Sequence, residues 1–247
     1  MKTLQEAYQQ FDIEQLIQTQ LAGTPTALNA YEECCGRYIG TQQTALIWEG
    51  TQGQSATWTF DQLADASGQL ANYFTQLGLK AGDCIAGLLP RSPELLVTIF
   101  ATWRIGAVYQ PLFTAFESKA IEHRIQTAKT QLIVTNTQQR PKLNALSDVK
   151  ILTVDAANQN QNYDADFWQV LTIQDSHFET VYRSFEDDFL MMFTSGTTGL
   201  AKSVPVPLKA IVAFKGYMQH AVDLRVEDSF WNLADPGWAY GLYYGIT

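Results

Sequence analysis

The residues best suited to chemistry lie in one loop that directly follows the apolar run 189–193 (FLMMF). The loop reads Thr194-Ser195-Gly196-Thr197-Thr198-Gly199-Leu200-Ala201-Lys202-Ser203. Its glycines let the backbone turn and approach a ligand closely, its hydroxyls donate hydrogen bonds, and its lysine adds a positive charge. This combination suits the oxygens of a polyphosphate. The alternative is an ordinary Ser/Gly turn with a solvated lysine, but the position straight after a buried strand favours a phosphate-binding loop.

A well-known phosphate-loop pattern, G-x-x-x-x-G-K-[ST], almost fits residues 196–203, with Ala201 where the second glycine belongs. In that pattern the lysine and the hydroxyl residue begin a helix. Here Pro205 and Pro207 follow Lys202 closely, and proline removes a backbone donor and favours extended backbone before it. The sequence therefore predicts a strand, a loop and a second strand, which argues against a Walker-type kinase or ATPase.

The elements that must position this loop alternate along the middle of the chain. Apolar spacing predicts helices over 61–77, 93–104 and 119–129, and short apolar runs predict strands over 84–89, 107–112, 131–135 and 150–154. Nearly continuous apolar strands that alternate with helices are typical of a parallel sheet covered on both faces. The predicted fold class is α/β, with partly parallel sheets flanked by helices.

The two ends of the chain are less regular. An amphipathic helix is expected within the first twenty residues, and a second helix from Thr24, with Pro25 at its first helical position. Strands are expected over 44–49 and 56–60, and the polar stretch 136–188 reads as a loop-rich connection. The predicted division is a first α/β subdomain, 1–188, followed by the phosphate-loop hairpin and the start of a second subdomain, 189–247.

Composition narrows the class of protein. The 247 residues are 46% apolar and carry 16 Lys and Arg against 25 Asp and Glu, a net charge of −9. A chain of this length and apolar content can bury a core, which argues against disorder. Its acidic balance, without a basic stretch, argues against a sequence-independent nucleic-acid binder. No apolar run reaches the length of a membrane span, and no signal peptide opens the chain.

The cysteines indicate a reducing environment, and the histidines show no pattern of metal ligands. Cys34 and Cys35 are adjacent and Cys84 is distant, so the chain has neither a CxxC pair nor a secreted disulfide framework, and we expect a cytoplasmic protein with buried or idle thiols. The three histidines, at positions 123, 177 and 220, lack the spacing of a ligand set and are predicted to be structural or surface residues. We therefore predict no metal site among the side chains. Asp187 and Asp188, just before the apolar run, read as a solvated acidic pair.

Three segments resemble the AMP-forming acyl-CoA synthetases, within the adenylating superfamily that includes luciferases and the adenylation domains of peptide synthetases. FTSGTTGLAKSV is similar to the signature loop of that family. Residues 58–116 are similar to the segment that precedes this loop in acetyl- and medium-chain acyl-CoA synthetases, and residues 231–247 to their acyl-pocket and tunnel segment. Ala201 and Ser203 depart from the pattern, which usually has proline and glycine there.

This resemblance implies a ligase of fatty acid metabolism that joins a small-molecule carboxylate to ATP. The acyl-adenylate and pyrophosphate form first, and the acyl group then passes to coenzyme A. Mg²⁺ is implied as the ion that shares the phosphate charge. Lys202 is the implied catalytic residue, because it would neutralise the phosphates and the departing pyrophosphate. The implied phosphate-binding residues are Thr194, Ser195, Gly196, Thr197, Thr198, Gly199 and Lys202.

The resemblance implies further contacts with the acyl group and with coenzyme A. It places Trp238 and Ala239 on the wall of the acyl pocket, Gly241 near the tunnel for the pantetheine arm, and Arg140 at the 3′-phosphate of coenzyme A. Each has an ordinary alternative: a tryptophan beside a turn is often core packing, and a lone arginine in a polar loop is often solvated.

The last residue, Thr247, falls within an apolar aromatic run. In the family the N-terminal domain continues further and is followed by a small C-terminal domain with the lysine that activates the carboxylate. We therefore expect an N-terminal fragment of the adenylate-forming fold, lacking the C-terminal domain and inactive alone. The alternative is a non-catalytic nucleotide-binding or partner-binding protein. The acyl chain length and the oligomeric state, including a homo-oligomer, are left open.

Overall fold

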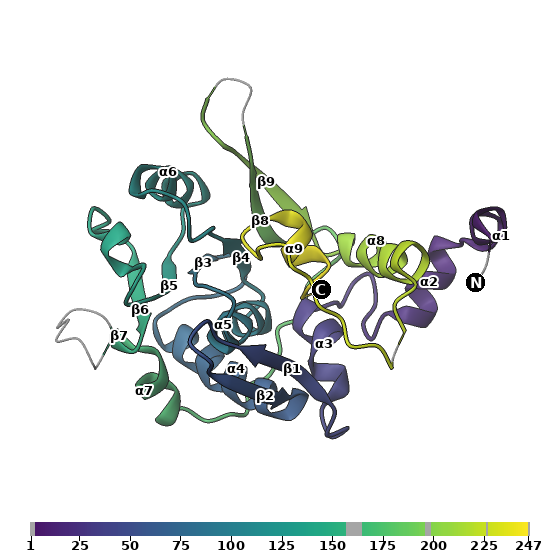
Figure 1. Ribbon diagram of the computed structural model, residues 1–247, viewed down its shortest axis with the longest axis horizontal. Coiled ribbons are helices and arrows are strands. Elements are labelled where there is room, and N and C mark those ends of the chain that lie inside the picture. Colours follow the sequence, from purple (N-terminus) through teal and green to yellow (C-terminus); the bar gives the residue numbers. More distant parts are fainter. Residues whose placement is uncertain (1–2, 157–164, 196–198, 226, 247) are drawn as a thin grey trace.

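A computed structural model describes residues 3–156, 165–195, 199–225 and 227–246. At its centre lies a seven-stranded sheet with the order β7-β6-β5-β3-β4-β8-β9 (Figure 1). Neighbouring strands run parallel except for the last pair, in which β9 is antiparallel to β8. The strands are β3 (Cys84–Leu88), β4 (Val108–Pro111), β5 (Leu132–Asn136), β6 (Lys150–Val154), β7 (Ala165–Asp166), β8 (Asp188–Thr194) and β9 (Lys202–Pro207). The predicted α/β class is confirmed.

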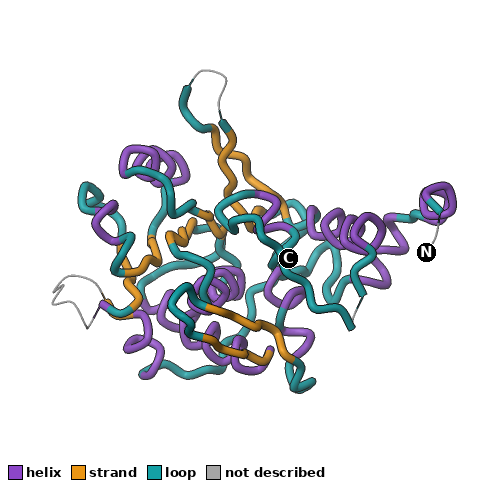
Figure 2. Tube along the Cα trace, in the orientation of Figure 1, coloured by secondary structure: helices purple, strands orange, loops and turns teal. Residues whose placement is uncertain are grey.

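Helices cover both faces of this sheet, as Figure 2 shows by colour. Alternate residues of β5 explain why the strands are apolar throughout: Leu132 and Val134 pack into the larger of two hydrophobic clusters, and Ile133 into the smaller one on the opposite face. The larger cluster includes side chains of α3 (Ala30–Cys34), α4 (Phe60–Gln76), α5 (Pro93–Arg104), α7 (Phe167–Thr172) and α8 (Ala210–Tyr217), and the smaller includes side chains of α6 (Ser118–Ala128) and η2 (Arg140–Leu143).

The local signals in the middle of the chain are confirmed. α5 begins and ends where predicted, with Pro93 in its first turn, and α4 begins with a capping box between Thr59 and Gln62. Gly78 follows α4 with a φ of +85°, a conformation that glycine adopts without strain. A separate antiparallel pair, β1 (Thr44–Glu49) and β2 (Ser55–Thr59), precedes α4. Within the described residues no helix combines the length and apolar character needed to cross a bilayer.

The two predictions for the N-terminal region are wrong. The first twenty residues form two helices, α1 (Leu4–Gln10) and α2 (Ile13–Gln20), because Asp12 caps the second through the backbone amides of Glu14 and Gln15. No helix begins at Thr24, whose amide and carbonyl instead pair with those of Ala27 at 3.0 Å. The next residue, Leu28, pairs with Arg183 through two backbone hydrogen bonds of 2.8 Å. This distant pairing overrides the local capping signal.

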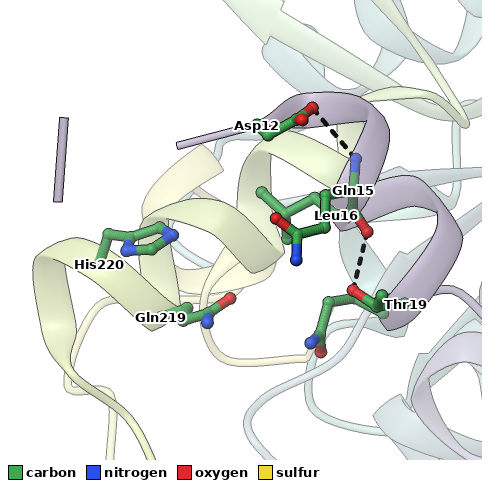
Figure 3. A pocket seen from close by; sticks show the side chains of 7 residues that line it. Asp12, Gln15, Leu16, Thr19, Gln219 and His220 are labelled. Carbon is green, nitrogen blue, oxygen red and sulfur yellow. Dashed lines mark hydrogen bonds between the residues drawn. The ribbon is translucent and has the colours of Figure 1, made fainter. Parts of the chain in front are cut away.

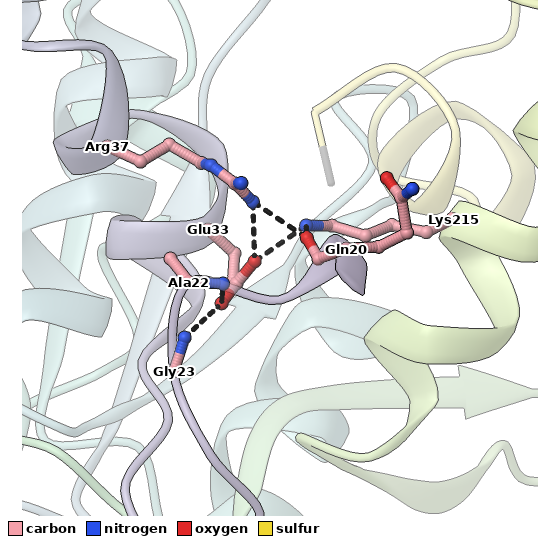
Figure 4. Close-up of polar contacts among 6 residues, drawn as sticks. All are labelled: Gln20, Ala22, Gly23, Glu33, Arg37 and Lys215. Atoms are coloured by element: carbon pink, nitrogen blue, oxygen red, sulfur yellow. Dashed lines mark hydrogen bonds and ion pairs between the residues drawn. The ribbon is translucent and has the colours of Figure 1, made fainter. Parts of the chain in front are cut away.

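A buried carboxylate ties α3 to α8 (Figure 4). The Glu33 side chain is fully buried and accepts hydrogen bonds from the backbone amides of Ala22 and Gly23 at 2.7 and 3.0 Å. It also forms ion pairs with Lys215 at 2.6 Å and Arg37 at 3.2 Å. A buried charge with this many donors is well compensated. The chain beyond α8 forms a π-helical turn, η4 (Met218–Val222), and a short helix, α9 (Ala239–Tyr243).

Candidate functional site

The predicted phosphate loop joins the two strands of an antiparallel hairpin. The register of β8 and β9 runs from Asp188 opposite Pro207 to Thr194 opposite Lys202. β9 is the last strand in the order of the sheet, where prolines that cannot donate to a ladder are tolerated. The strand-loop-strand prediction is therefore confirmed, because Lys202 begins a strand and α8 begins only at Ala210. In Figure 1 the hairpin projects beyond the rest of the sheet.

Thr194 and Lys202 face each other where the ladder opens into the loop. Both are exposed, as is Ser195. Gly199 has a φ of +105°, which residues with a side chain rarely adopt, so this position requires glycine. Gly196, Thr197 and Thr198 lie outside the described residues. The described part of the loop thus carries three exposed hydroxyls, on Thr194, Ser195 and Ser203, and the ammonium group of Lys202.

Helix α6 contacts both arms of the hairpin. The Nε2 atom of His123 lies 2.8 Å from the carbonyl oxygen of Ala201, and the guanidinium of Arg124 lies 5.6 Å from the ring centre of Phe193. The same guanidinium lies 4.0 Å from the ring centre of Phe116, and burial lowers its pKa from the ordinary value. The sequence predicts a structural or surface role for His123 and no connection with the loop. No local pattern signals a contact between residues so far apart in the chain.

The start of β8 is fixed by an ion pair. Asp187 accepts hydrogen bonds from Arg183 Nη2 at 2.7 Å and from the Ser184 amide at 2.8 Å. These bonds favour the carboxylate and lower the pKa of Asp187 to about 2. The prediction of a solvated acidic pair is therefore wrong for Asp187, which holds the turn before the strand. Burial raises the pKa of Asp188 above its usual value.

Arg140 lies in η2, which follows the carboxyl end of β5. Its Nη1 atom donates a hydrogen bond of 2.9 Å to Asn144 Oδ1. In the same turn Lys142 Nζ donates to the Thr114 carbonyl oxygen at 2.5 Å, which links η2 to the connection between β4 and α6. The contact of Arg140 with a phosphate of coenzyme A stays a prediction.

The described residues 231–246 include Trp238, which reaches the carboxyl end of β4. Trp238 is 56% exposed, and the centre of its ring lies 5.7 Å from the centre of the Phe113 ring. Ala239 is exposed at the start of α9, whereas Gly241 is buried. A Cβ atom at Gly241 would lie 2.2 Å from the Asp235 carbonyl oxygen, so glycine is required for packing. The roles of these residues in an acyl pocket and tunnel stay predictions.

A separate cavity of about 440 Å³ lies between α2 and η4 (Figure 3). Of the residues that line it only Leu16 is buried, and it contains none of the predicted site residues. The described residues include no group of three or more histidines, cysteines or acids that could hold a metal ion. The three thiols are free, and burial raises the pKa of each to about 12, as the prediction of buried or idle thiols requires.

The fold and the hairpin define the class: an α/β protein whose mostly parallel sheet ends in a glycine-containing strand-loop-strand hairpin. The sequence pattern of the AMP-binding enzyme family matches residues 37–247, and the chain belongs to that family. It is 28% identical to the acetyl-coenzyme A synthetase of Bacillus subtilis (strain 168), over 100% of this chain and 44% of that protein. It is 31% identical to the acetyl-coenzyme A synthetase of Streptomyces avermitilis, over 88% of this chain and 37% of that protein.

Solved structures agree with this family. The crystal structure of the Brucella canis acyl-CoA synthetase superposes with a TM-score of 0.94 and 45% identity, over 100% of this chain and 46% of that one. The anthranilate CoA ligase AuaEII in complex with anthranoyl-AMP superposes with a TM-score of 0.82 at 19% identity, over 95% of this chain and 45% of that one, which shows the fold alone. The chain thus spans less than half the length of these relatives.

Proposed function

We propose that this chain carries the phosphate-binding part of an AMP-forming acyl-CoA synthetase. Such an enzyme forms an acyl-adenylate and pyrophosphate from a carboxylate and ATP, and then transfers the acyl group to coenzyme A. The observation that carries the proposal is the position of Lys202 opposite Thr194 at the mouth of the hairpin, in a chain of the AMP-binding family. The acetyl-CoA and acyl-CoA synthetases among its relatives support the choice of reaction.

In this proposal the chemistry is stabilisation of charge on a leaving group. The hydroxyls of Thr194 and Ser195 donate hydrogen bonds to the β- and γ-phosphates, and the Lys202 ammonium offsets the charge that develops on pyrophosphate. The carboxylate substrate is the nucleophile, so no side chain needs to attack the phosphorus. ATP arrives with Mg²⁺, for which the described residues provide no carboxylate cluster, and the proposal assigns it no protein ligand.

The finer assignments belong to the same proposal. Arg140 binds the 3′-phosphate of coenzyme A, Trp238 and Ala239 line the acyl pocket, and Gly241 lies near the pantetheine tunnel. The family resemblance supports these roles, together with the contact of Trp238 with Phe113 at the carboxyl end of β4, because ligands of open α/β sheets bind at that edge. Fatty acid metabolism and a cytoplasmic location are proposed on the resemblance and on the free cysteines.

Binding of ATP and exchange of pyrophosphate into ATP test this proposal. We expect the chain to bind ATP, and Lys202→Ala to weaken binding at least about tenfold, the effect of one charge-assisted contact. Lys209→Ala is the matched control, since Lys209 pairs with exposed Glu186 outside the loop. Binding that is equal in both variants contradicts the role of Lys202.

Exchange assays with acetate through octanoate are made on the natural protein from its source cells, because this chain is expected to be inactive alone, and they separate the enzyme from a non-catalytic relative. Carboxylate-dependent exchange supports the synthetase and ranks its substrates. The intact mass of the natural protein shows whether it is longer than this chain. If that protein binds ATP but does not exchange pyrophosphate, the non-catalytic nucleotide-binding alternative is favoured. No ATP binding at all overturns the proposal.

A further inference from the structure

Two consecutive residues of α6 contact the two arms of the hairpin, one on each side of the pair formed by Thr194 and Lys202. His123 contacts the carbonyl of Ala201, the residue just before Lys202. Arg124 stacks near Phe193, the residue just before Thr194. Phe193 pairs with Ser203 on the sheet side of the Thr194–Lys202 pair, whereas Ala201 lies on its loop side, so α6 contacts each arm next to that pair.

Helix α6 is a rigid support for these contacts. Its Ile121 and Ile125 are buried in the smaller hydrophobic cluster, at 0% and 5% exposure. The carbonyl of Arg124 accepts a hydrogen bond of 3.2 Å from Gln110 on the neighbouring strand β4. The supported segment is far more open, since Leu200 is 66% and Val204 39% exposed. The contacts from α6 therefore restrain the exposed end of the hairpin relative to the packed sheet.

The contact of His123 acts on the backbone that carries Lys202. A carbonyl oxygen only accepts, so the Nε2 atom of His123 is the donor in this hydrogen bond. The peptide unit is planar, so the direction of the Ala201 carbonyl also sets the amide nitrogen and Cα of Lys202. Holding that carbonyl from α6 limits the directions in which the lysine side chain can leave the strand.

We propose that His123 is a positioning residue for Lys202, and that Arg124 supports the opposite arm through Phe193. This inference rests on the proposed function, because it assigns His123 to the orientation of a phosphate-binding lysine. Loss of the hydrogen bond leaves the packed helix intact and loosens only the start of β9. Its effect is therefore expected in ATP binding and in local backbone exchange, with the global melting temperature unchanged.

Three substitutions at one position test the geometry. His123→Ala is expected to weaken ATP binding about tenfold, the effect of one directional hydrogen bond. His123→Gln places an amide nitrogen near the position of Nε2 and is expected to recover binding to within about twofold, whereas His123→Asn mimics Nδ1 and does not. His177→Ala is the matched control, since His177 is exposed on another part of the surface. Unchanged binding in His123→Ala, or equal recovery by Asn and Gln, overturns the proposal.

Hydrogen-deuterium exchange separates this inference from the proposed function. Peptides that cover residues 200–207 should exchange faster in His123→Ala and recover in His123→Gln, in the absence of any nucleotide. If the wild-type chain binds no ATP but shows this exchange pattern, the proposed function is wrong, and His123 still holds the start of β9 in place. If exchange in this segment is the same in all variants, the positioning role is wrong, whatever the binding assay gives.

Discussion

The middle of the sheet and the hairpin that extends it are held by different kinds of contact. In β3 and β5, Ile85 and Ile133 are fully buried, and helices cover both faces. In the hairpin, the end of β8 and the start of β9 are exposed, and specific contacts from His123 and Arg124 fix them. Burial spread over many side chains fixes the sheet, whereas the geometry of the candidate site depends on a few directional contacts. Substitutions in the two regions should therefore affect different measurements.

The largest loss of stability is expected in the packed region. Trp103 is 1% exposed, donates from Nε1 to the Phe189 carbonyl at 3.1 Å and packs on the Phe189 ring. We expect Trp103→Ala to lower the free energy of unfolding by about 3–5 kcal/mol, through lost burial and a cavity. Denaturant titration measures the change. A loss below about 1 kcal/mol would show that the site collapses and that the packing comparison is wrong.

The next largest effect is expected at the buried carboxylate. Glu33→Gln leaves Lys215 and Arg37 without their charged partner, and we expect a loss of about 3 kcal/mol. Glu186→Gln breaks an exposed pair with Lys209 and should change stability by about 0.5 kcal/mol or less. Chemical denaturation of both variants measures the difference. Equal losses of unfolding free energy in the two variants would mean that the buried ion pairs of Glu33 stabilise the fold no more than the exposed pair of Glu186 does.

A smaller effect is expected at Gly199 in the hairpin, and Gly216 in α8 provides the opposite outcome. Gly199→Ala places a side chain at a φ of +105° and should strain the turn by about 1 kcal/mol. It should weaken ATP binding measurably while the melting temperature changes little, because the strain is confined to the loop. Gly216→Ala lies within α8, where the added Cβ meets its neighbours at 3.6 Å, and should stabilise the helix by up to about 1 kcal/mol. A stabilising Gly199→Ala would contradict the assigned backbone conformation.

The smallest effect concerns pH and the ion pair before β8. Because the folded pKa of Asp187 is about 2, below its ordinary value of 3.8, the pair stabilises the fold above pH 4. This contribution is lost as the pH falls from about 4 towards 2, and its partial exposure keeps it below about 1 kcal/mol. Asp187→Asn should flatten the stability profile in that window, whereas Glu49→Gln, an exposed acid on β1, should leave it unchanged. Parallel profiles for wild type and Asp187→Asn would refute the assignment.

Local patterns were sufficient for most of the middle of the chain. The helix over 93–104 and the strand over 150–154 have the bounds that the sequence predicts, because apolar spacing, Pro93 and nearby glycines act on their own neighbours. The strand-loop-strand form of the site follows from Pro205 and Pro207 for the same reason. These features depend on backbone preferences that neighbouring residues alone determine.

Contacts between distant residues needed the tertiary structure. The capping signal at Thr24 predicts a helix, yet pairing of Leu28 with Arg183 imposes a bridge and a turn. Asp187 looks like a solvated acid, yet it pairs with Arg183 and Ser184, four and three residues before it, where the distant Leu28 holds the Arg183 backbone. In each case a long-range contact, or the geometry that such contacts impose, outweighs a local preference of similar size.

The sequence by itself determined the α/β class, the family resemblance and the loop with Gly199 and Lys202, because composition, periodicity and motif spacing are local properties. Only the tertiary structure decided that His123 reaches Ala201, that Glu33 joins α3 to α8, and that the exposed Trp238 ring lies against Phe113. The physical reason is that these contacts arise when the connections between strands close over the sheet. Their directions depend on packing that no short stretch of sequence encodes.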